Sequence, residues 1–162
     1  MTTLQRAVIR VPFGELGIAW RGRCVVGVDL SPAPEAAVTA SALPLWLSDE
    51  LAAYFADPQY RFGCELEQAG TAFQQRVWSR ITAIRPGRTR TYGALAAELG
   101  SAARAVGNAC RANPVPLVVP CHRVVGAHGL GGFAGDTSGR LIAVKRWLLR
   151  HEHALPVAGG DT

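Results

Sequence analysis

The sequence predicts an α/β domain at residues 1–69, built from a small antiparallel sheet plus a helix, and a mostly helical domain at residues 70–153, with a tail at 154–162. Short β-branched runs separated by turn residues fill the first 30 positions, a pattern typical of hairpin strands. After Gly70 the pattern changes to apolar residues at helical spacing, flanked by residues that cap helices. These two patterns together indicate the fold class.

The elements of the first domain are short. Strands are expected in "RAVIRV", "LGIAW" and "RCVVGVDL", because "PFGE" and "RGR" between them favour turns. A helix is expected at residues 43–58, where apolar residues that include Tyr54 recur on one face and an Asp-Pro pair ends the pattern. "RFGCELE" alternates like a half-buried strand, with Cys64 toward the core.

Three helices are expected in the second domain. The first begins with a capping box, in which Thr71 and Gln74 bond to each other's backbone N–H groups. The second begins at a Thr91 cap and stops at Gly100, and the third follows at once with Ser101 as its cap. Two short helices joined across Gly-Ser have the spacing of a helix-turn-helix.

The third of these helices combines small residues with arginines. Its small residues are Ala102, Ala103, Ala105 and Gly107, and its cationic residues are Arg104 and Arg111. Small residues let a helix backbone approach a neighbour closely, while long cationic side chains project from it. One interpretation is helix packing, and the other is docking in a nucleic-acid groove with Arg104 inserted.

Positive charge is concentrated in the second domain. Up to Glu65, five arginines stand against seven acidic residues, whereas from Leu66 onward twelve basic residues stand against five, giving −2 and +7. Lys145 is the only lysine, and the planar guanidinium of arginine suits phosphate contact. Nucleic acid is therefore the leading class of partner, although a solvated basic surface would give the same charge.

Other partners and cofactors find little support in the sequence. No apolar run approaches the roughly 20 residues of a membrane span, and Arg6, Arg10 and Pro12 interrupt any secretory signal, so we expect no membrane partner and a cytoplasmic location. The four cysteines and four histidines lack the paired spacing of a zinc site. We therefore expect neither a metal nor another cofactor.

The stretch "PCHRV" at residues 120–124 places a cysteine beside a histidine. A nucleophilic Cys121 needs a nearby base, for which His122 is the candidate, with Glu152 to orient it if the last helix folds back. "VPLVV" is typical of a buried strand, in which adjacent side chains point to opposite faces, so a water or a break in the strand would have to connect the pair. The alternative is a structural cysteine.

Four segments together closely resemble the O6-alkylguanine-DNA alkyltransferases, also called methylated-DNA–protein-cysteine methyltransferases: "GTAFQQRVW", "IRPGRTRTYGALAAELG", "ARAVGNACRANPVPLVVPCHRVVG" and "KRWLLRHE". The resemblance implies a ribonuclease-H-like N-terminal domain and a winged helix-turn-helix. It also implies a monomer that repairs O6-alkylguanine in double-stranded DNA by irreversible transfer of the alkyl group to its own cysteine, without a cofactor. Action on O4-alkylthymine and cooperative assembly on DNA stay open.

The resemblance implies catalytic roles for matching residues. Cys121 would accept the alkyl group, His122 would take the thiol proton through a water, and Glu152 would hold His122. Tyr92 would donate to a ring nitrogen of the departing guanine, and Lys145 would help to hold the same end of the site.

DNA and substrate contacts follow in the same way. Arg104 would fill the stack left by the flipped nucleotide, and Asn113 would be the hinge between that helix and the active-site strand. The other groove contacts would be Ala102, Ala103, Ala105, Gly107 and Arg111. The substrate contacts would be Pro116, the carbonyls of Cys121 and Val124, and the backbone N–H of Ala134.

The loop before Lys145 departs from the family pattern, since it is longer and has Phe133 where tyrosine is more usual.

Rival functions leave part of the sequence unexplained. A lesion-binding protein without chemistry would have its cysteine replaced, and a winged-helix regulator would leave "PCHRV" without a purpose. A Cys-His hydrolase would need an oxyanion hole and repeated turnover.

Overall fold

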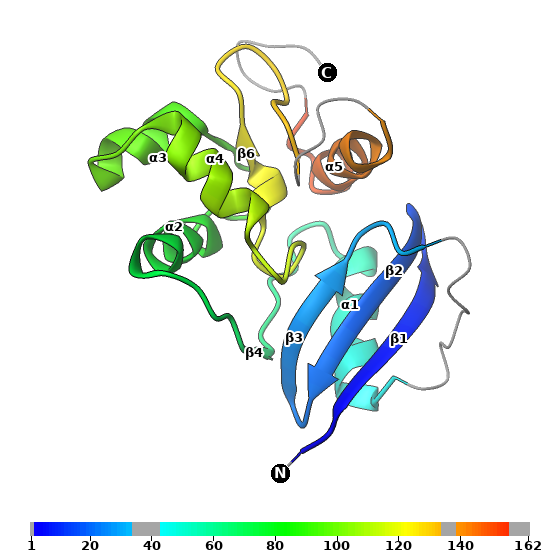
Figure 1. Cartoon of the computed structure of the whole chain (residues 1–162). Helices are drawn as coiled ribbons and strands as arrows, with labels where there is room; N and C mark the ends of the chain where they lie inside the picture. The colour runs from blue at the N-terminus through cyan, green and yellow to red at the C-terminus, as the bar shows by residue number, and fades with distance from the viewer. Residues whose placement is uncertain (1, 34–42, 134–138, 156–162) are drawn as a thin grey trace.

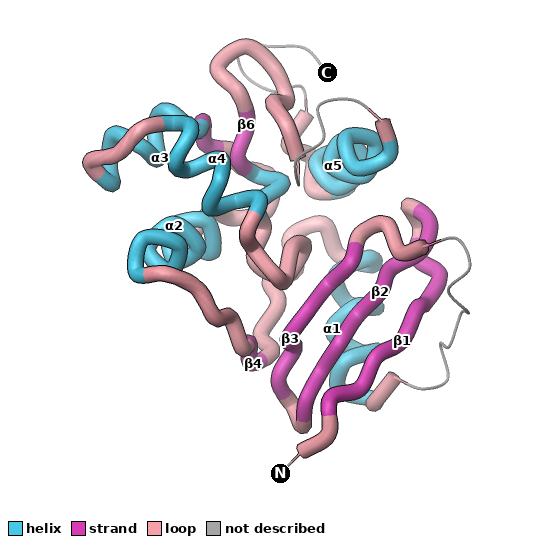
Figure 2. Tube along the Cα trace, in the orientation of Figure 1, coloured by secondary structure: helices cyan, strands magenta, loops and turns pink. Residues whose placement is uncertain are grey.

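The structure is a computed structural model that describes residues 2–33, 43–133 and 139–155. A sheet backed by one helix forms one half of the molecule, and a group of helices lies beside it (Figure 1). Short strands and long connecting loops link the helices of the second half (Figure 2). Within the described ranges, no helix is long and apolar enough to cross a membrane.

The N-terminal half contains a four-stranded sheet in the order β1-β2-β3-β4. β1 (Leu4–Val11), β2 (Gly14–Arg21) and β3 (Cys24–Asp29) are antiparallel, as predicted. The short β4 (Glu65–Leu66) pairs parallel to β3, so the sheet is mixed, and the prediction of a purely antiparallel sheet was wrong in this strand. A parallel partner requires a long crossover, and here the chain between β3 and β4 supplies it.

Helix α1 (Leu45–Ala56) lies in that crossover and packs against one face of the sheet (Figure 1). It confirms the predicted helix, with Leu47, Leu51 and Tyr54 buried on its inner face. The apolar stripe of α1 therefore forms much of the core of the N-terminal half.

The C-terminal half is mostly helical, as predicted. Its elements are α2 (Ala72–Thr82), β5 (Arg90–Thr91), α3 (Tyr92–Leu99), α4 (Ala103–Arg111), a 3-10 turn (Cys121–Arg123), β6 (Val124–Val125) and α5 (Arg140–His151). β5 and β6 pair in parallel and hold the start of α3 beside the 3-10 turn.

Two of the predicted caps are confirmed. Thr71 Oγ1 accepts from the backbone N–H of Gln74 at 3.1 Å, and Gln74 Oε1 accepts from the N–H of Thr71 at 2.9 Å. Thr91 Oγ1 accepts from the N–H of Ala94 at 3.0 Å at the start of α3. Side chains thus satisfy free N–H groups at both helix starts.

The predicted Ser101 cap of α4 was wrong. Ser101 belongs to the end of α3, because its N–H donates to the carbonyl of Ala96 at 2.8 Å while Gly100 takes a left-handed conformation with φ 65°. This is the glycine-dependent way of closing a helix. The N-cap of α4 is Ala102, which makes no side-chain cap bond.

Gly70 lies just before α2 and packs closely against the ring of Trp78. A Cβ atom at this position would lie 2.5 Å from the ring of Trp78, which is buried and donates from Nε1 to the carbonyl of Ala109 at 2.8 Å. Because the ring has no room to move, we expect Gly70→Ala to lower the free energy of unfolding by about 1–3 kcal/mol. Chemical denaturation measures this loss. Gly63→Ala is the control, since a Cβ there meets nothing within 4 Å, and an equal loss in both variants would contradict the packing account.

Candidate active site

The 3-10 turn places three consecutive side chains in the interior: Cys121, His122 and Arg123 are all buried. The prediction of a strand before Cys121 was wrong, because residues 116–119 form a turn with a single bridge between Pro116 and Val119. The tight turn interrupts the alternation of an extended chain. It therefore supplies the break that the cysteine-histidine pair requires.

The thiol of Cys121 is buried in this turn and has a polar neighbour. Asn113 Nδ2 donates to its Sγ at 3.3 Å. Burial raises the pKa of Cys121, although the Asn113 hydrogen bond and the charge of Lys145 oppose the rise. The resting group is thus a thiol, with neighbours that would stabilise a thiolate once a base takes the proton.

Asn113 connects the end of α4 to the turn. Its Nδ2 also donates to the carbonyl of Val119 at 3.0 Å. Its Oδ1 accepts from the N–H of Val115 at 3.0 Å and from Gln68 Nε2 at 3.1 Å. These bonds fix the orientation of the amide, so the same nitrogen faces the sulfur of Cys121.

Glu152, directly after α5, accepts hydrogen bonds from three side chains. Its Oε2 lies 2.8 Å from His122 Nε2 and accepts from Arg123 Nη2 at 2.9 Å. Arg123 Nε donates to Oε1 at 2.8 Å, which makes the arginine contact bidentate. The hydroxyl of Tyr54 on α1 donates to Oε2 at 2.6 Å. The carboxylate is fully buried, yet every donor faces it directly.

The charges in this cluster follow from burial and pairing. Burial alone raises the pKa of a carboxyl. The charge that His122 carries when protonated, the charge of Arg123 and the hydrogen bonds of both residues outweigh this effect and hold the pKa of Glu152 well below its usual range. Burial lowers the pKa of His122, against the raising effect of Glu152, so the ring is neutral near pH 7. Arg123 is then the permanent cation that balances Glu152.

The tautomer of His122 follows from these contacts. An ionised carboxylate can only accept, so Nε2 of the neutral ring carries the hydrogen that faces Glu152. Nδ1 is then the basic nitrogen, and it has no hydrogen-bond partner within the described part of the chain. The turn therefore holds a buried thiol and, on the next residue, a free basic nitrogen.

Lys145 on α5 occupies the other end of the site. Its ammonium donates to three carbonyls, those of Val124 at 2.8 Å, Leu130 at 2.6 Å and Gly132 at 2.9 Å. Burial lowers the pKa of Lys145 to about 8, opposed by the nearby thiols. Three acceptors match the three hydrogens of a charged ammonium.

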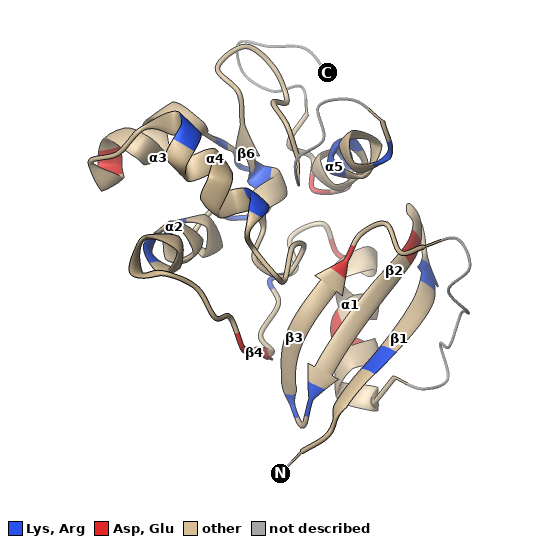
Figure 3. Cartoon of the chain, viewed as in Figure 1, with Lys and Arg blue, Asp and Glu red and all other residues tan. Residues whose placement is uncertain are grey.

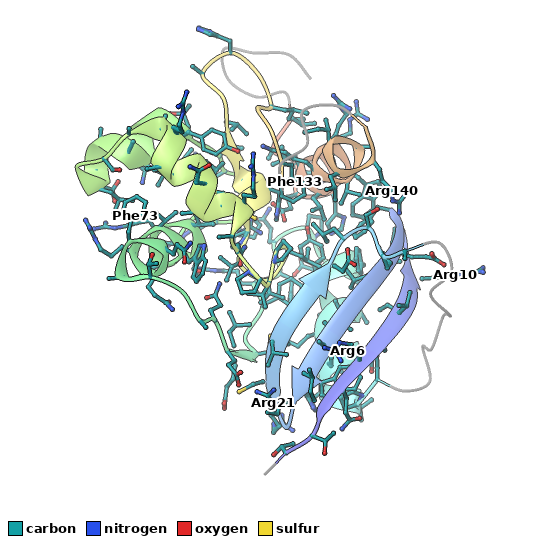
Figure 4. The ribbon with its side chains drawn as sticks, viewed as in Figure 1. Arg6, Arg10, Arg21, Phe73, Phe133 and Arg140 are labelled. Carbon is teal, nitrogen blue, oxygen red and sulfur yellow. The ribbon has the colours of Figure 1, made fainter. Side chains whose placement is uncertain are left out.

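Tyr92 and Phe133 flank this ammonium. Lys145 Nζ lies 5.8 Å from the centroid of each ring, and the Tyr92 hydroxyl donates to the carbonyl of Gly132 at 3.1 Å. Burial raises the pKa of Tyr92, so its hydroxyl stays a donor. Phe133 lies in the chain segment between α4 and α5 (Figure 4).

Arg140, at the start of α5, reaches toward the sheet (Figure 4). Its Nε donates to Ser31 Oγ at 3.0 Å.

Helix α4 has one buried and one open face. Val106, Ala109 and Cys110 are buried against the other helices. On the other side Ala102, Ala103, Arg104 and Arg111 are exposed, while Ala105 and Gly107 are half-buried. The arginines mark the two ends of the helix (Figure 3). Small residues and arginines thus share the solvent-facing side of α4.

The remaining predicted contacts are placed only in part. Pro116 is half-buried and lines a groove with Asn113 and Leu141. The carbonyl of Val124 accepts from Lys145, so one of its two lone pairs is in use. Ala134 lies outside the described residues.

Comparison with known proteins identifies the family. Residues 72–154 match the family model described as the DNA-binding domain of 6-O-methylguanine DNA methyltransferase. The chain belongs to the 6-O-methylguanine DNA methyltransferase family.

One curated member of this family is the methylated-DNA–protein-cysteine methyltransferase of Salmonella typhimurium. The two are 50% identical over 113 residues, which are 67% of this chain and 63% of that protein. The matched part therefore spans less than two thirds of the Salmonella protein.

Two solved structures from Mycobacterium tuberculosis extend the likeness to nearly the whole chain. A variant of the O6-methylguanine methyltransferase is 35% identical with a TM-score of 0.74, covering 94% of both chains. A relative solved in complex with DNA is 36% identical with a TM-score of 0.71, covering 91% of this chain and 92% of the other.

Two residues of the buried cluster were missed in the sequence analysis. Arg123 is part of "PCHRV", but a basic residue beside a histidine gives no sign that it is buried and paired. Tyr54 was assigned only to the apolar face of α1, and nothing near it in the sequence points to a carboxylate 98 residues away. Arg123 becomes visible only when Glu152 is placed beside the 3-10 turn, and Tyr54 only when α1 is placed beside Glu152.

The groups in this site can remove the proton from one buried thiol, and the resulting thiolate can act as a nucleophile. It contains a thiol, a neutral imidazole with a free nitrogen, an ionised carboxylate and a lysine whose charge lowers the cost of a thiolate. Within residues 2–33, 43–133 and 139–155, no group of three or more His, Cys, Asp and Glu side chains could hold a metal. This set of groups is suited to attack by sulfur on an electrophilic carbon.

Proposed function

We propose that this protein repairs O6-alkylguanine in double-stranded DNA by transferring the alkyl group to Cys121. The observation that carries the proposal is the hydrogen-bonded series from Arg123 and Glu152 to His122, next to a buried cysteine on a 3-10 turn. Family membership supports it, and so does the Mycobacterium relative solved with DNA. O4-alkylthymine is a second candidate substrate with the same kind of reacting carbon.

In the proposed step, the thiol proton of Cys121 passes through a water to Nδ1 of His122. The resulting imidazolium is stabilised by Glu152 through Nε2. The thiolate then forms a bond to the alkyl carbon while the bond from that carbon to O6 breaks, and its electron pair goes to the guanine. Tyr92 gives its proton to a ring nitrogen of the departing guanine, which leaves as the neutral base; the tyrosinate then regains a proton from solvent, and His122 releases the thiol proton to solvent. A stable thioether remains, and each chain reacts once.

DNA would be held by α4. The lesion carbon is part of a stacked base, so the nucleotide has to be flipped out before a buried thiol can reach it. The small residues of α4 allow close approach to the minor groove, and Arg104 would take the place of the flipped nucleotide. Arg111 would contact phosphate, and Asn113 would link α4 to the reacting sulfur.

The proposed fold assignment places the DNA contacts and the reacting cysteine in one domain. We assign α3 and α4, with the β5–β6 pair, to a winged helix-turn-helix, and the sheet with α1 to a ribonuclease-H-like domain. The boundary would fall near Gly70, with residues 1–69 and 70–153 as the two domains and 154–162 as a tail. The protein would act as a monomer.

Intact-protein mass spectrometry tests the function. The protein is incubated with a short duplex containing O6-methylguanine and then mapped by peptide analysis. We expect one added methyl group per chain, located on Cys121, with no second addition when DNA is in excess. Tight lesion binding without a mass change would overturn the transfer reaction and leave a recognition protein.

Arg104→Ala tests the proposed role of α4. We expect slower repair of duplex DNA, because the flipped state loses the side chain that fills the stack, but an unchanged reaction with free O6-benzylguanine. Stacking interactions of about 1–3 kcal/mol correspond to a loss of roughly 5- to 150-fold in duplex repair. Arg10→Ala removes an exposed arginine on β1 and serves as the charge control. Equal losses on duplex and free base would rule out the insertion role.

A further inference from the structure

Tyr54 joins the N-terminal half of the molecule to the buried cluster. Its hydroxyl donates to Glu152 Oε2 at 2.6 Å, and both side chains are fully buried. Tyr54 lies on α1, whereas Cys121, His122, Arg123 and Glu152 all come from the C-terminal half. A group outside the family model's residues 72–154 therefore contacts the carboxylate that pairs with His122.

The surroundings of Tyr54 hold its ring in one orientation. The ring stacks on Phe62 with centroids 5.2 Å apart and an interplanar angle of 25°, and Phe55 meets it edge-on at 5.2 Å. The His151 ring lies 4.9 Å away, and its Nε2 is 2.7 Å from the carbonyl of Tyr54. His151 itself stacks on Trp147 with a 14° interplanar angle. The hydroxyl is thus aimed at Glu152 by packing on several sides.

The hydroxyl acts as a donor throughout the relevant pH range. Burial and the negative charge of Glu152 raise the pKa of Tyr54, so the hydroxyl stays protonated. Glu152 Oε2 is shared by three donors: the Tyr54 hydroxyl, His122 Nε2 and Arg123 Nη2. Each donor takes up part of the negative charge on that oxygen, so the strength of one bond affects the others.

We propose that Tyr54 is a positioning residue for the alkyl transfer, which fixes Glu152 and limits how strongly its carboxylate attracts the proton of His122. This inference rests on the proposed function. Within the described residues, the Tyr54 hydroxyl bonds to Glu152 and not to the sulfur or the imidazole, so it acts through Glu152. The N-terminal half thereby contributes to setting the basicity of the histidine that activates Cys121.

The expected effect of losing the hydroxyl has a defined sign. Without Tyr54, more negative charge stays on Oε2, and the interaction that raises the pKa of His122 becomes stronger. The other charged groups that act on His122 are Arg123 from the 3-10 turn and Lys145 from α5, and both are unchanged. His122 must be neutral to accept the thiol proton, so the low-pH limb of the rate profile moves to higher pH.

The test is the rate of methyl transfer from an O6-methylguanine duplex between pH 5 and pH 9. For Tyr54→Phe we expect transfer about tenfold slower at pH 6.5, from the loss of one hydrogen bond to a charged group, and a low-pH midpoint at higher pH. Tyr60→Phe is the matched control, because the Tyr60 hydroxyl lies in the same half of the protein but donates to Glu50 instead of Glu152. The control is expected to keep both the rate and the midpoint.

A second variant keeps the proposal testable if Tyr54→Phe folds poorly. Replacing Tyr54 with 3-fluorotyrosine keeps the ring and makes the hydroxyl a stronger donor, so the midpoint is expected to move to lower pH. Unchanged midpoints in both Tyr54 variants, with active wild-type protein, would overturn the positioning role and leave the proposed function intact. Wild-type protein that takes up no methyl group at any pH would overturn the function itself.

Discussion

A Cys121→Ser chain is expected to bind an O6-methylguanine duplex but to take up no methyl group from it. A serine hydroxyl is far less acidic than a thiol, and oxygen attacks an alkyl carbon less readily than sulfur does, so His122 activates it far less effectively. We expect the transfer rate to fall by at least about 10³-fold, which corresponds to more than about 4 kcal/mol of barrier. Mass spectrometry measures the transfer, and a gel-shift assay measures the binding.

Cys24→Ser is the matched control for this prediction. Cys24 is a half-buried thiol on β3, hydrogen-bonded to Glu65, and it lies in the other half of the protein. Its variant is expected to take up one methyl group per chain. Methyl uptake by the Cys121→Ser chain, or an adduct mapped to another cysteine in the wild type, would refute the assignment of Cys121 as acceptor.

Glu152→Gln is expected to have the second large effect, on both transfer and stability. The amide keeps the size of the side chain but leaves Arg123 buried without its counter-charge and removes the anion that stabilises protonated His122. Breaking a buried pair in this way costs about 3–5 kcal/mol of folding stability. Loss of general-base assistance slows transfer by roughly 10²- to 10⁴-fold. Denaturation and single-turnover kinetics measure the two losses.

The stability loss should depend on pH in a defined direction. The folded pKa of Glu152 lies below its unfolded value, so its contribution is fully present above the unfolded pKa and is lost as pH falls through the folded pKa. The difference between wild type and Glu152→Gln is therefore expected to be largest near pH 7 and to shrink below about pH 4.5. A difference that stays constant down to pH 2 would mean that charge on Glu152 does not stabilise the fold.

Glu98→Gln is the control for this variant. Glu98 pairs with Arg80 and Arg90 through both of its oxygens, but all three side chains are partly exposed. Solvent screens exposed pairs, so this change should have little effect on stability and none on transfer.

Elements whose signals are local could be predicted from the sequence. The Thr71–Gln74 capping box and the Thr91 cap each depend on residues three positions apart, and both were predicted correctly. The three antiparallel strands follow from alternation and short turns, which are equally local. The placement of Cys121 beside His122 followed directly from the sequence.

Some features could not be predicted, because they depend on distant contacts or on a local backbone conformation that the composition does not reveal. β4 contains two residues, and its parallel pairing with β3 is decided by the path of the intervening chain. Ser101 has the composition of a cap, but the left-handed Gly100 assigns its N–H to α3 instead. A turn at residues 116–119 replaces the strand expected in "VPLVV", which has the composition of a strand although its backbone turns, with Leu117 at φ 78°.

The bonds that meet at Glu152 also determine when the reactive centre can form. They join Glu152 to Tyr54, His122 and Arg123, which lie 98, 30 and 29 positions earlier in the chain. The chain loses conformational entropy when loops of this length close, and it does so before the contacts contribute any stabilising free energy. Interactions between residues so far apart in the sequence therefore form late in folding. During synthesis, His122 and Arg123 leave the ribosome before their carboxylate partner. His122 therefore gains the carboxylate that stabilises its protonated form only in chains whose α5 has docked against the 3-10 turn, and Glu152 does not assist proton transfer from Cys121 before then.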